Sequence, residues 1–449
     1  MDLAGMRRIF SDLGAVKMYA TELAKNDTSK TQVYFGSNFE VLNVIPNKGI
    51  FPDNREDKNI FKAKLDFSWV NESGTCSPAP HAQLILYPQY PEVRFSGFLL
   101  GSQNAPSELM TSRLPGRLLV LAITAAGKIF AMVFSADSAI AAEFRSLNRE
   151  PDAGVFIDLT FTGADNSRAA LLRELTRINH EGWIKSKRLD GHGVLGPCNA
   201  RNCGGLTLEA ELGVRPNSLA EPDYLGWEVK QYKVSNFERY TSGVVTLMTP
   251  EPIGGFYGEQ GAAAFVRKFG YADKCGREDR MNFGGVHKSG ERHPLTGLTL
   301  RLIGFDGEKG TIVKDTGGIG LVSDNGEIGA LWPFAGLLTH WVKKHARAVY
   351  VPSLTQKEPL AYMYGDKVRL ALRTDFLKFL KAMNSGEVYY DPGLKIENIS
   401  TKPKLKTRNQ FRIKSKQIGA LYETVAYSRQ SGQGSLLSRS AFLLMPVSA

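Results

Sequence analysis

Apolar and polar residues alternate through much of the first 150 residues, as in half-buried β-strands. Only the start has helical spacing, with Met6, Ile9, Phe10 and Leu13 on one face. The alternating runs predict strands over residues 61–69, 83–87, 93–99, 117–124 and 128–134, the last two joined as a hairpin. We therefore expect a mainly β N-terminal domain, a barrel or a sandwich, over residues 1–150.

Helical and strand patterns then alternate along the chain. Helices are predicted over residues 169–178, 207–212, 260–269, 333–345 and 374–383, and strands over residues 224–230, 243–249, 298–304 and 348–351. This mixture is typical of an α/β domain with a mixed sheet flanked by helices. A chain of 449 residues is long for one domain. We assign residues 151–165 to a linker, 166–430 to the α/β domain and 431–449 to a C-terminal tail.

The strand over residues 224–230 carries the first candidate chemistry. Its period of two places Glu228 and Lys230 on the face opposite Trp227 and Val229, and Asp223 precedes it. Two carboxylates suit Mg²⁺, which takes one or two such ligands besides water and phosphate oxygens. The lysine can orient or deprotonate a water molecule, or balance charge on a phosphorus-bound oxygen.

Spacing alone leaves a second interpretation open, because a solvated strand face with a Glu–Lys pair has the same pattern. A further Glu-x-Lys triplet, Glu56 to Lys58 with Asp53 before it, lies in a stretch that is typical of a loop. The residues around each triplet must therefore decide between a site and a surface pair.

The surrounding residues contain several separate motifs in a fixed order. They are Gly182-Trp183-Ile184, Ser186, Arg188, Leu206-Thr207-Leu208-Glu209, Leu212-Gly213, Asp223-x4-Glu228-x-Lys230, and two last strands over residues 386–391 and 410–413. This series resembles the MvaI/BcnI family of restriction endonucleases and, more distantly, the MutH family of mismatch-repair nickases. The resemblance covers residues 165–425 and implies a PD-(D/E)XK, MutH-like nuclease core.

The resemblance also implies roles for individual residues. Asp223 and Glu228, with the Val229 carbonyl, would hold Mg²⁺, and Lys230 would orient or activate water. Residues 340–352 are similar to the MutH segment that supplies a second lysine, matched here by Lys344. The implied catalytic residues are Glu209, Asp223, Glu228, Lys230 and Lys344.

Charge is distributed unevenly along the chain. Residues 1–160 hold 16 Lys and Arg against 17 Asp and Glu, whereas the remaining residues hold 40 against 28. A basic excess confined to the second domain favours a polyanionic partner. Near its end, alternation around Phe411 and Ile413 places polar side chains on one strand face. We expect DNA contacts from Lys404, Lys406, Arg408, Gln410 and Arg412, although a solvated edge strand has the same pattern.

Together these observations predict a Mg²⁺-dependent type II restriction endonuclease that cleaves double-stranded DNA at a specific sequence. The resemblance implies a monomer and a cognate DNA methyltransferase in the same system. Two alternatives remain open: a MutH-like repair nickase, and a non-cleaving DNA-binding protein. No complete Walker motif occurs, so no nucleotide cofactor is expected.

The sequence gives less information about the cellular compartment, the cysteines and the role of the N-terminal domain. No signal peptide or membrane span is predicted, so we expect a cytoplasmic protein. Cys198 and Cys203 are spaced like half a zinc site, but no second pair follows, which favours free thiols. Residues 24–33 resemble the effector domain of EcoRII-type restriction enzymes. The N-terminal domain is therefore an effector DNA-binding domain or a structural, protein-contacting one.

Overall fold

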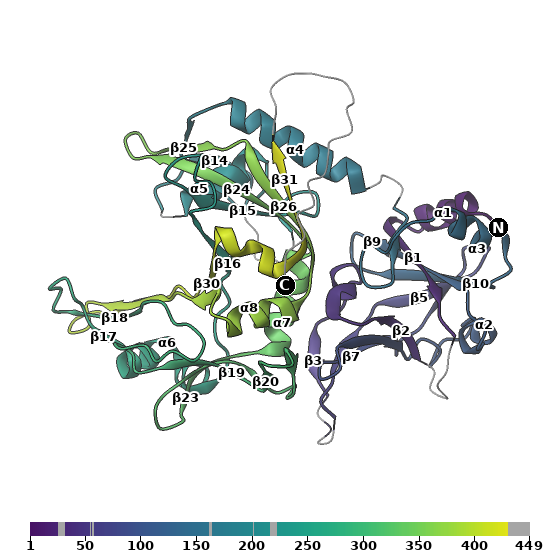
Figure 1. Ribbon diagram of the computed structural model, residues 1–449, viewed down its shortest axis with the longest axis horizontal. Coiled ribbons are helices and arrows are strands. Elements are labelled where there is room, and N and C mark those ends of the chain that lie inside the picture. Colours follow the sequence, from purple (N-terminus) through teal and green to yellow (C-terminus); the bar gives the residue numbers. More distant parts are fainter. Residues whose placement is uncertain are drawn as a thin grey trace. The chain divides into compact units, whose positions relative to one another are not determined.

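The computed structural model describes residues 1–25, 32–53, 55, 58–160, 164–200, 202–215 and 222–429 (Figure 1). The chain divides into two compact units. The N-terminal unit comprises Met1–Ala169 with Thr311–Asp315, and the C-terminal unit comprises Ala170–Gly310 with Thr316–Ala449. The first unit is rich in strands and the second is mixed α/β, as the sequence predicts.

Two sheets make up most of the described part of the N-terminal unit. The six-stranded sheet runs in the order β11 (Ile157–Asp158), β1 (Ala15–Leu23), β9 (Arg117–Thr124), β10 (Ile129–Phe134), β5 (Phe67–Val70) and β6 (Cys76–Pro78). The five-stranded sheet runs in the order β2 (Gln32–Gly36), β8 (Glu92–Ser96), β7 (Gln83–Tyr87), β4 (Phe61–Lys64) and β3 (Ile50–Pro52). Rings of Phe67 in one sheet and Phe95 in the other lie 5.1 Å apart, so the sheets pack against each other.

One predicted strand is two strands. Residues 61–69 alternate without interruption, but β4 ends at Lys64 and β5 begins at Phe67, and the two belong to different sheets. The prediction of a single strand is wrong, because the same alternation of apolar and polar residues continues across the break between the two strands. Alternation reports which side chains are buried and cannot report that the chain crosses from one sheet to the next.

In the described part of this unit, the sheets are accompanied by the α-helices α1 (Leu3–Asp12), α2 (Ser107–Thr111) and α3 (Ala139–Ser146) and by a 3-10 helix over Phe39–Asn43. Asp2 caps α1, since its Oδ1 accepts a hydrogen bond from the Gly5 amide at 2.8 Å. Met6 and Phe10 of α1 are fully buried in a core with Leu118 and Val120 of β9. This confirms the helical face predicted from the spacing.

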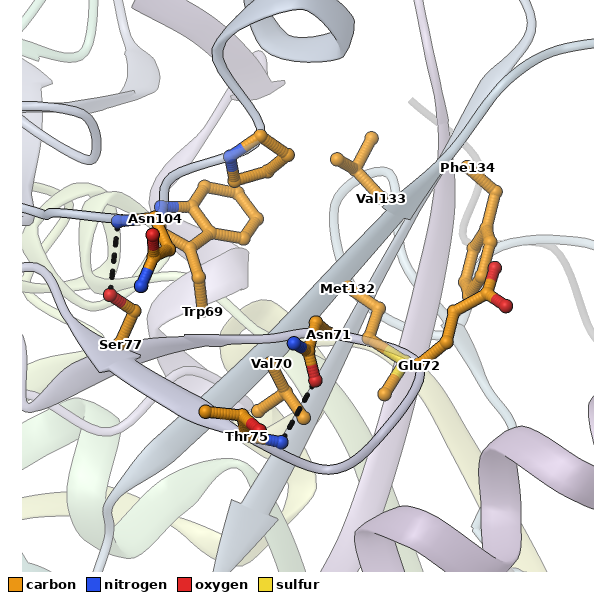
Figure 2. A pocket seen from close by; sticks show the side chains of 11 residues that line it. Trp69, Val70, Asn71, Glu72, Thr75, Ser77, Asn104, Met132, Val133 and Phe134 are labelled. Carbon is orange, nitrogen blue, oxygen red and sulfur yellow. Dashed lines mark hydrogen bonds between the residues drawn. The ribbon is translucent and has the colours of Figure 1, made fainter.

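A cavity of about 190 Å³ in this unit lies beside Trp69 (Figure 2). Its polar groups are engaged within the protein: the Ser77 hydroxyl accepts from the Asn104 amide, and the Asn71 side-chain oxygen accepts from the Thr75 amide. Glu72 is the one acidic residue in its lining. The cavity therefore offers no group of acidic or basic side chains for catalysis.

A mixed sheet organises the C-terminal unit. Its main path is β12 (Ile184–Lys185), β25 (Ala361–Tyr364), β24 (Arg347–Gln356), β26 (Lys367–Thr374) and β31 (Tyr422–Arg429), and β15 (Glu228–Lys233) also pairs with β24. The β15–β24 pair is parallel and aligns Glu228 with Ala348 and Lys230 with Tyr350. The other strand pairs of this sheet are antiparallel.

Helices pack on this sheet and on the elements beside it. They are α4 (Ala164–His180), α5 (Cys203–Glu211), α7 (Phe334–His345) and α8 (Phe376–Asn384). Leu171, Leu175 and Ile178 of α4 pack in one core with Val229 and Val349 of the central strands. Figure 1 shows α4 and α5 beside β24 and β25.

The described residues of the unit also form several smaller sheets and a further α-helix. They are β13 (Lys187–Leu189) with β14 (Leu195–Pro197); β16 (Val244–Met248), β30 (Phe411–Lys414) and β27 (Val388–Tyr390); β17 (Tyr271–Ala272), β18 (Arg280–Gly284), β28 (Gly393–Glu397) and β29 (Lys404–Lys406); β19 (Thr299–Ile303), β22 (Gly318–Val322) and β23 (Ile328–Pro333); and α6 (Gly255–Phe269). They carry the basic segment that the sequence singles out.

We expect Phe10→Ala to lower the free energy of unfolding by about 3–5 kcal/mol, because the ring is fully buried and the cavity would not refill. Arg8→Ala, an exposed change on the same helix, should stay within about 0.5 kcal/mol of the parent. Urea unfolding of both variants tests this, and equal effects would contradict the assignment of the core.

Candidate active site

A tight turn places Asp223 beside the start of β15. The Tyr224 and Trp227 backbones exchange hydrogen bonds of 3.0 and 2.8 Å, and Leu225 and Gly226 between them have positive φ angles of 49° and 82°. The predicted strand therefore begins at Glu228, four residues later than expected, because this turn occupies its first half. The Val229 amide donates to Asp223 Oδ2 at 2.8 Å, which fixes the carboxylate at this point.

Alternation along β15 separates the core from the site. Trp227 and Val229 are 2% and 5% exposed and pack in the core beneath the sheet. Glu228 and Lys230 extend from the opposite face, as predicted. The Lys230 ammonium donates to Glu228 Oε1, and the Glu228 side chain is almost completely buried.

Lys344 reaches the same carboxylate from α7. Its Nζ lies 3.7 Å from Glu228 Oε1. Because β15 and β24 are parallel, the residues just before β24 lie at the same end of the sheet as the start of β15. The last turn of α7 immediately precedes β24, so the connection between the two elements delivers Lys344 to Glu228.

Glu228 Oε1 therefore faces two ammonium groups, whereas Oε2 is buried and accepts no hydrogen bond from any described residue. A buried carboxylate oxygen without a partner is costly in a folded protein. A cation ligand is the natural occupant of such a position.

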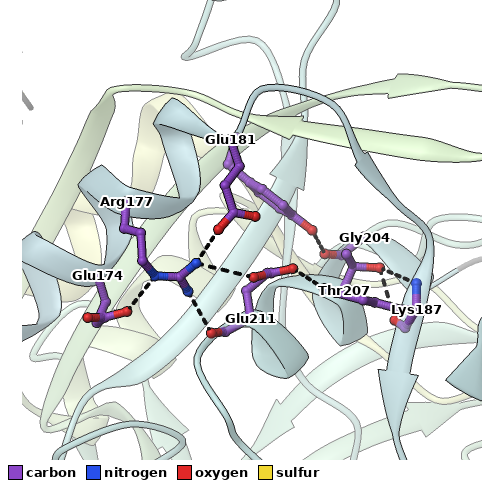
Figure 3. Close-up of polar contacts among 8 residues, drawn as sticks. Glu174, Arg177, Glu181, Lys187, Gly204, Thr207 and Glu211 are labelled. Carbon is purple, nitrogen blue, oxygen red and sulfur yellow. Dashed lines mark hydrogen bonds and ion pairs between the residues drawn. The ribbon is translucent and has the colours of Figure 1, made fainter. Parts of the chain in front are cut away.

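Glu209 comes from α5, which hydrogen bonds hold to two neighbouring strands. The Thr207 hydroxyl accepts from the Lys187 amide at 3.1 Å and donates to its carbonyl at 3.0 Å. The Tyr364 hydroxyl donates to the Gly204 carbonyl at 2.7 Å. These bonds join α5 to β13 and β25 (Figure 3).

Ion pairs hold the last turn of α5 in place. Glu211 forms ion pairs with Lys187 of β13 and Arg177 of α4, and Arg177 also pairs with Glu174 and Glu181 (Figure 3). The Glu211 side chain is only 7% exposed, so these pairs are partly shielded from water. Sequence reasoning missed this network, because nothing in the spacing of its members joins three separate elements.

The charges of the cluster perturb one another. Burial, followed by the charge of Asp223, raises the pKa of Glu209 above its usual range. Burial, followed by the charge of Glu228, likewise raises the pKa of Asp223. Burial disfavours the Lys230 ammonium, but Glu228 and Asp223 outweigh it, so the pKa of Lys230 is raised. Carboxylates whose charged forms are disfavoured gain from a nearby cation.

The predicted catalytic residues Glu209, Asp223, Glu228, Lys230 and Lys344 thus interact in one cluster. Among the described residues, no three His, Cys, Asp or Glu side chains form a metal site by themselves. Asp223, Glu228 and the Val229 carbonyl are a smaller set, and two carboxylates are what Mg²⁺ usually receives from a protein. The unpartnered Glu228 Oε2 fits that role. Glu56 and Asp57 of the other triplet lie outside the described residues.

The predicted DNA-binding residues form a second group on β29, β30 and the segment between them. Arg412 donates to Asp391 and is half-buried, whereas Lys406 pairs with Glu397 at 2.9 Å. Glu397 also pairs with Lys395, and hydrogen bonds from Lys395 and Lys406 lower the pKa of this carboxyl to about 2. Arg408 and Lys404 are exposed, and Gln410 is half-buried. No bond of the group to the carboxylate cluster occurs among the described residues.

Cys198 and Cys203 correct the sequence interpretation. They form a disulfide with Cα atoms 5.7 Å apart, so the expectation of free thiols is wrong. Cys198 follows β14, and Cys203 begins α5. Their spacing was compatible with metal ligation, thiols or a bridge, and only the loop geometry selects the bridge.

Comparison with known families decides the identity of the C-terminal unit. The model of the MvaI/BcnI restriction endonuclease family matches residues 172–422, more than half of the chain. The chain belongs to this family. It is accordingly a type II site-specific endonuclease, and the match spans every residue of the carboxylate cluster and of the basic group.

Other comparisons add context to this MvaI/BcnI endonuclease. No curated protein matches. The restriction endonuclease MvaI bound to cognate DNA is similar at 15% identity and TM-score 0.44, covering 58% of this chain and 97% of that one. MvaI without DNA is similar at 16% identity and TM-score 0.34, covering 60% and 100%. Within the described residues, no helix combines the length and apolarity that crossing a membrane requires.

Residues 1–169 of the N-terminal unit lie outside the family match, which begins at residue 172. Most of the stretch that resembles EcoRII-type effector domains, residues 26–31, lies outside the described residues. An effector role for the N-terminal unit of this MvaI/BcnI endonuclease therefore stays a prediction.

We expect Asp223→Asn to abolish cleavage while raising the thermal stability of the metal-free enzyme at pH 7. Because the pKa of Asp223 is raised above its ordinary value of 3.8, its ionised form destabilises the fold above that pKa. The gain should shrink as the pH falls and disappear below pH 3.8, where Asp223 is protonated in both the folded and the unfolded chain. Asp12→Asn, an exposed change, should leave stability and cleavage unaltered. Calorimetry at several pH values measures this, and a lower melting temperature for Asp223→Asn at pH 7 would contradict it.

Proposed function

We propose that this endonuclease hydrolyses both strands of a specific DNA sequence with Mg²⁺ as cofactor, at the cluster around Glu228. The observation that carries the proposal is the buried, unpartnered Glu228 Oε2 beside a carboxylate and two lysines. A protein that only binds DNA gains nothing from burying negative charge where a phosphate must approach. Family membership supports sequence-specific DNA cleavage as the reaction.

Each residue then has a role that follows from its surroundings. Asp223, Glu228 and the Val229 carbonyl would hold the ion. Bound Mg²⁺ supplies a lowered pKa for water and polarises the phosphoryl oxygens. Lys230, tied to Glu228 Oε1, stays protonated because its pKa is raised, and it donates to the attacking water. A positioned donor of this kind orients the water for attack opposite the leaving oxygen.

Lys344 and Glu209, the other two residues of the cluster, act through their charges. Lys344 lies 3.7 Å from Glu228 Oε1 and can donate to the phosphoryl oxygens as negative charge grows on them. Glu209 is partly buried with a raised pKa and adds negative charge near Asp223, which strengthens the cluster's attraction for a cation. The network that holds α5 keeps Glu209 at this place.

DNA recognition falls to the basic group. Arg412 is held by Asp391 and lies on a strand between two fully buried residues, Phe411 and Ile413, so its guanidinium has little freedom. A pre-positioned arginine suits bidentate recognition of guanine, and the adjacent Gln410 suits adenine. Exposed Lys404 and Arg408 suit phosphates, which position DNA without specifying sequence. Lys406 would contribute once its pairing with Glu397 is exchanged for a phosphate.

The system around the enzyme follows from the same proposal. A host that carries a sequence-specific endonuclease needs its own sites protected, so we propose a cognate methyltransferase. We further propose that the enzyme acts as a cytoplasmic monomer without a nucleotide cofactor. The domain division at residues 150–166 accompanies this proposal, with the N-terminal domain as an accessory.

The decisive change is at the cluster. We expect Glu228→Ala and Lys230→Ala to reduce cleavage of plasmid DNA by at least about a thousandfold while leaving DNA affinity within a few-fold of the parent. Glu92→Ala is the matched control, because Glu92 pairs with Arg94 at the same spacing on strand β8 of the N-terminal unit. Defined linear fragments from the parent support restriction. Nicked circles alone would identify a nickase, and a gel shift without cleavage would identify a binding protein.

Recognition and phosphate contact should separate by mutation. Arg412→Ala should cost about 1–3 kcal/mol of binding at the cognate site and relax discrimination at one base pair. Lys404→Ala should weaken binding to all sequences equally and reduce the salt dependence. Lys357→Ala, another exposed lysine of the same unit, serves as control. Affinities for cognate and single-mismatch duplexes at several salt concentrations test this, and equal losses on all duplexes for Arg412→Ala would restrict it to phosphate contact.

A further inference from the structure

A buried chain of hydrogen bonds lies behind the carboxylate cluster and is not used by the mechanism above. Tyr350 Oη of β24 and Tyr422 Oη of β31 are 2.9 Å apart. Tyr422 Oη is 3.3 Å from His345 Nδ1, and His345 Nε2 is 3.2 Å from the Leu247 carbonyl of β16. Tyr350 and His345 are 0% exposed and Tyr422 is 3% exposed. Four elements thus meet in one chain of polar atoms.

The hydrogen bonds all run in one donor-to-acceptor direction, which the Leu247 carbonyl at the end of the row determines. The Leu247 carbonyl only accepts, so His345 Nε2 carries the hydrogen. Burial, followed by the charge of Lys230, lowers the pKa of His345 well below its usual value, so its Nδ1 is a bare acceptor. Tyr422 must then donate to His345. Its single proton is engaged, so Tyr350 must donate to Tyr422.

Tyr350 places this row of hydrogen bonds on the sheet face that carries Glu228. Tyr350 is aligned with Lys230 on the neighbouring parallel strand, so its side chain extends from the same face as those of Glu228 and Lys230. Burial raises the pKa of both tyrosines, and the charge of Glu228 contributes to each. Tyr350 thus shares a sheet face with Glu228, whose Oε2 is buried and receives no hydrogen bond from the described residues.

We infer that Tyr422 and His345 are positioning residues that draw the Tyr350 proton away from Glu228 and thereby keep Glu228 Oε2 free for a divalent cation. This inference rests on the proposed function, since it assigns a device that prepares the proposed metal ligand. Without Tyr422, the Tyr350 hydroxyl loses its acceptor and turns to the carboxylate. Any cation must then displace a hydrogen bond to a charged group before it can bind.

The test measures Mn²⁺ binding to the full chain without DNA, by electron paramagnetic resonance of the free ion. We expect Tyr422→Phe to weaken Mn²⁺ binding at least about tenfold, because a charge-assisted hydrogen bond opposes it. Tyr350→Phe removes the competing donor and should bind as the parent does. The double variant Tyr350→Phe/Tyr422→Phe should regain parental binding, which loss of packing at Tyr422 could not produce.

Two controls separate the possible outcomes. Tyr390→Phe removes another buried hydroxyl, the donor to Asn409, and should leave Mn²⁺ binding unchanged. Thermal unfolding of every variant reports on folding. If Glu228→Ala binds Mn²⁺ as the parent does, the proposed metal site itself is wrong. If Glu228→Ala loses binding but Tyr422→Phe keeps it, or the double variant stays weak, the inference about the tyrosines is overturned while the metal site stands.

Discussion

The C-terminal unit is arranged around the buried carboxylate of Glu228. Removing an ionised carboxylate from water is expensive unless opposite charge and hydrogen bonds accompany it. Lys230 supplies one ammonium from two residues along the same strand, and Lys344 supplies another from the helix before the neighbouring strand. Parallel pairing of β15 with β24 makes the second contact possible. An antiparallel arrangement would carry the end of α7 to the far end of β15.

Because buried carboxylates need such partners, several helices and strands are required to hold a few side chains in place. Glu209 is delivered by a helix that is bonded to β13 and β25 and ion-paired to α4. Asp223 is returned to the strand by a turn whose two central residues have positive φ angles. Each carboxylate raises the cost of ionising the others, as the raised pKa values of Glu209 and Asp223 indicate. The cluster therefore holds unfavourable negative charge, and the surrounding elements keep its side chains from moving apart.

In the basic group, too, ion pairs hold charged side chains in place. Arg412 and Lys406 are paired with Asp391 and Glu397, so their positions are set before any partner arrives. An acidic partner of this kind restrains an arginine in one orientation, which favours discrimination over raw affinity. Lys404 and Arg408, by contrast, are exposed. Under the proposed function, the paired Arg412 would read bases, whereas the exposed Lys404 and Arg408 would contact phosphates.

Sequence alone determined the class of the fold and most elements, and it proposed the five residues that the structure brings together in the cluster. Alternation predicted the strands and the opposite faces of Glu228 and Val229, and ordered motifs predicted a family that the match over residues 172–422 confirms. Tertiary structure decided what local pattern cannot express. It divided residues 61–69 between two sheets, joined Cys198 to Cys203, and assembled the Glu211 network and the tyrosine–histidine chain. These features depend on which distant segments meet, and periodicity records only which side of an element is buried.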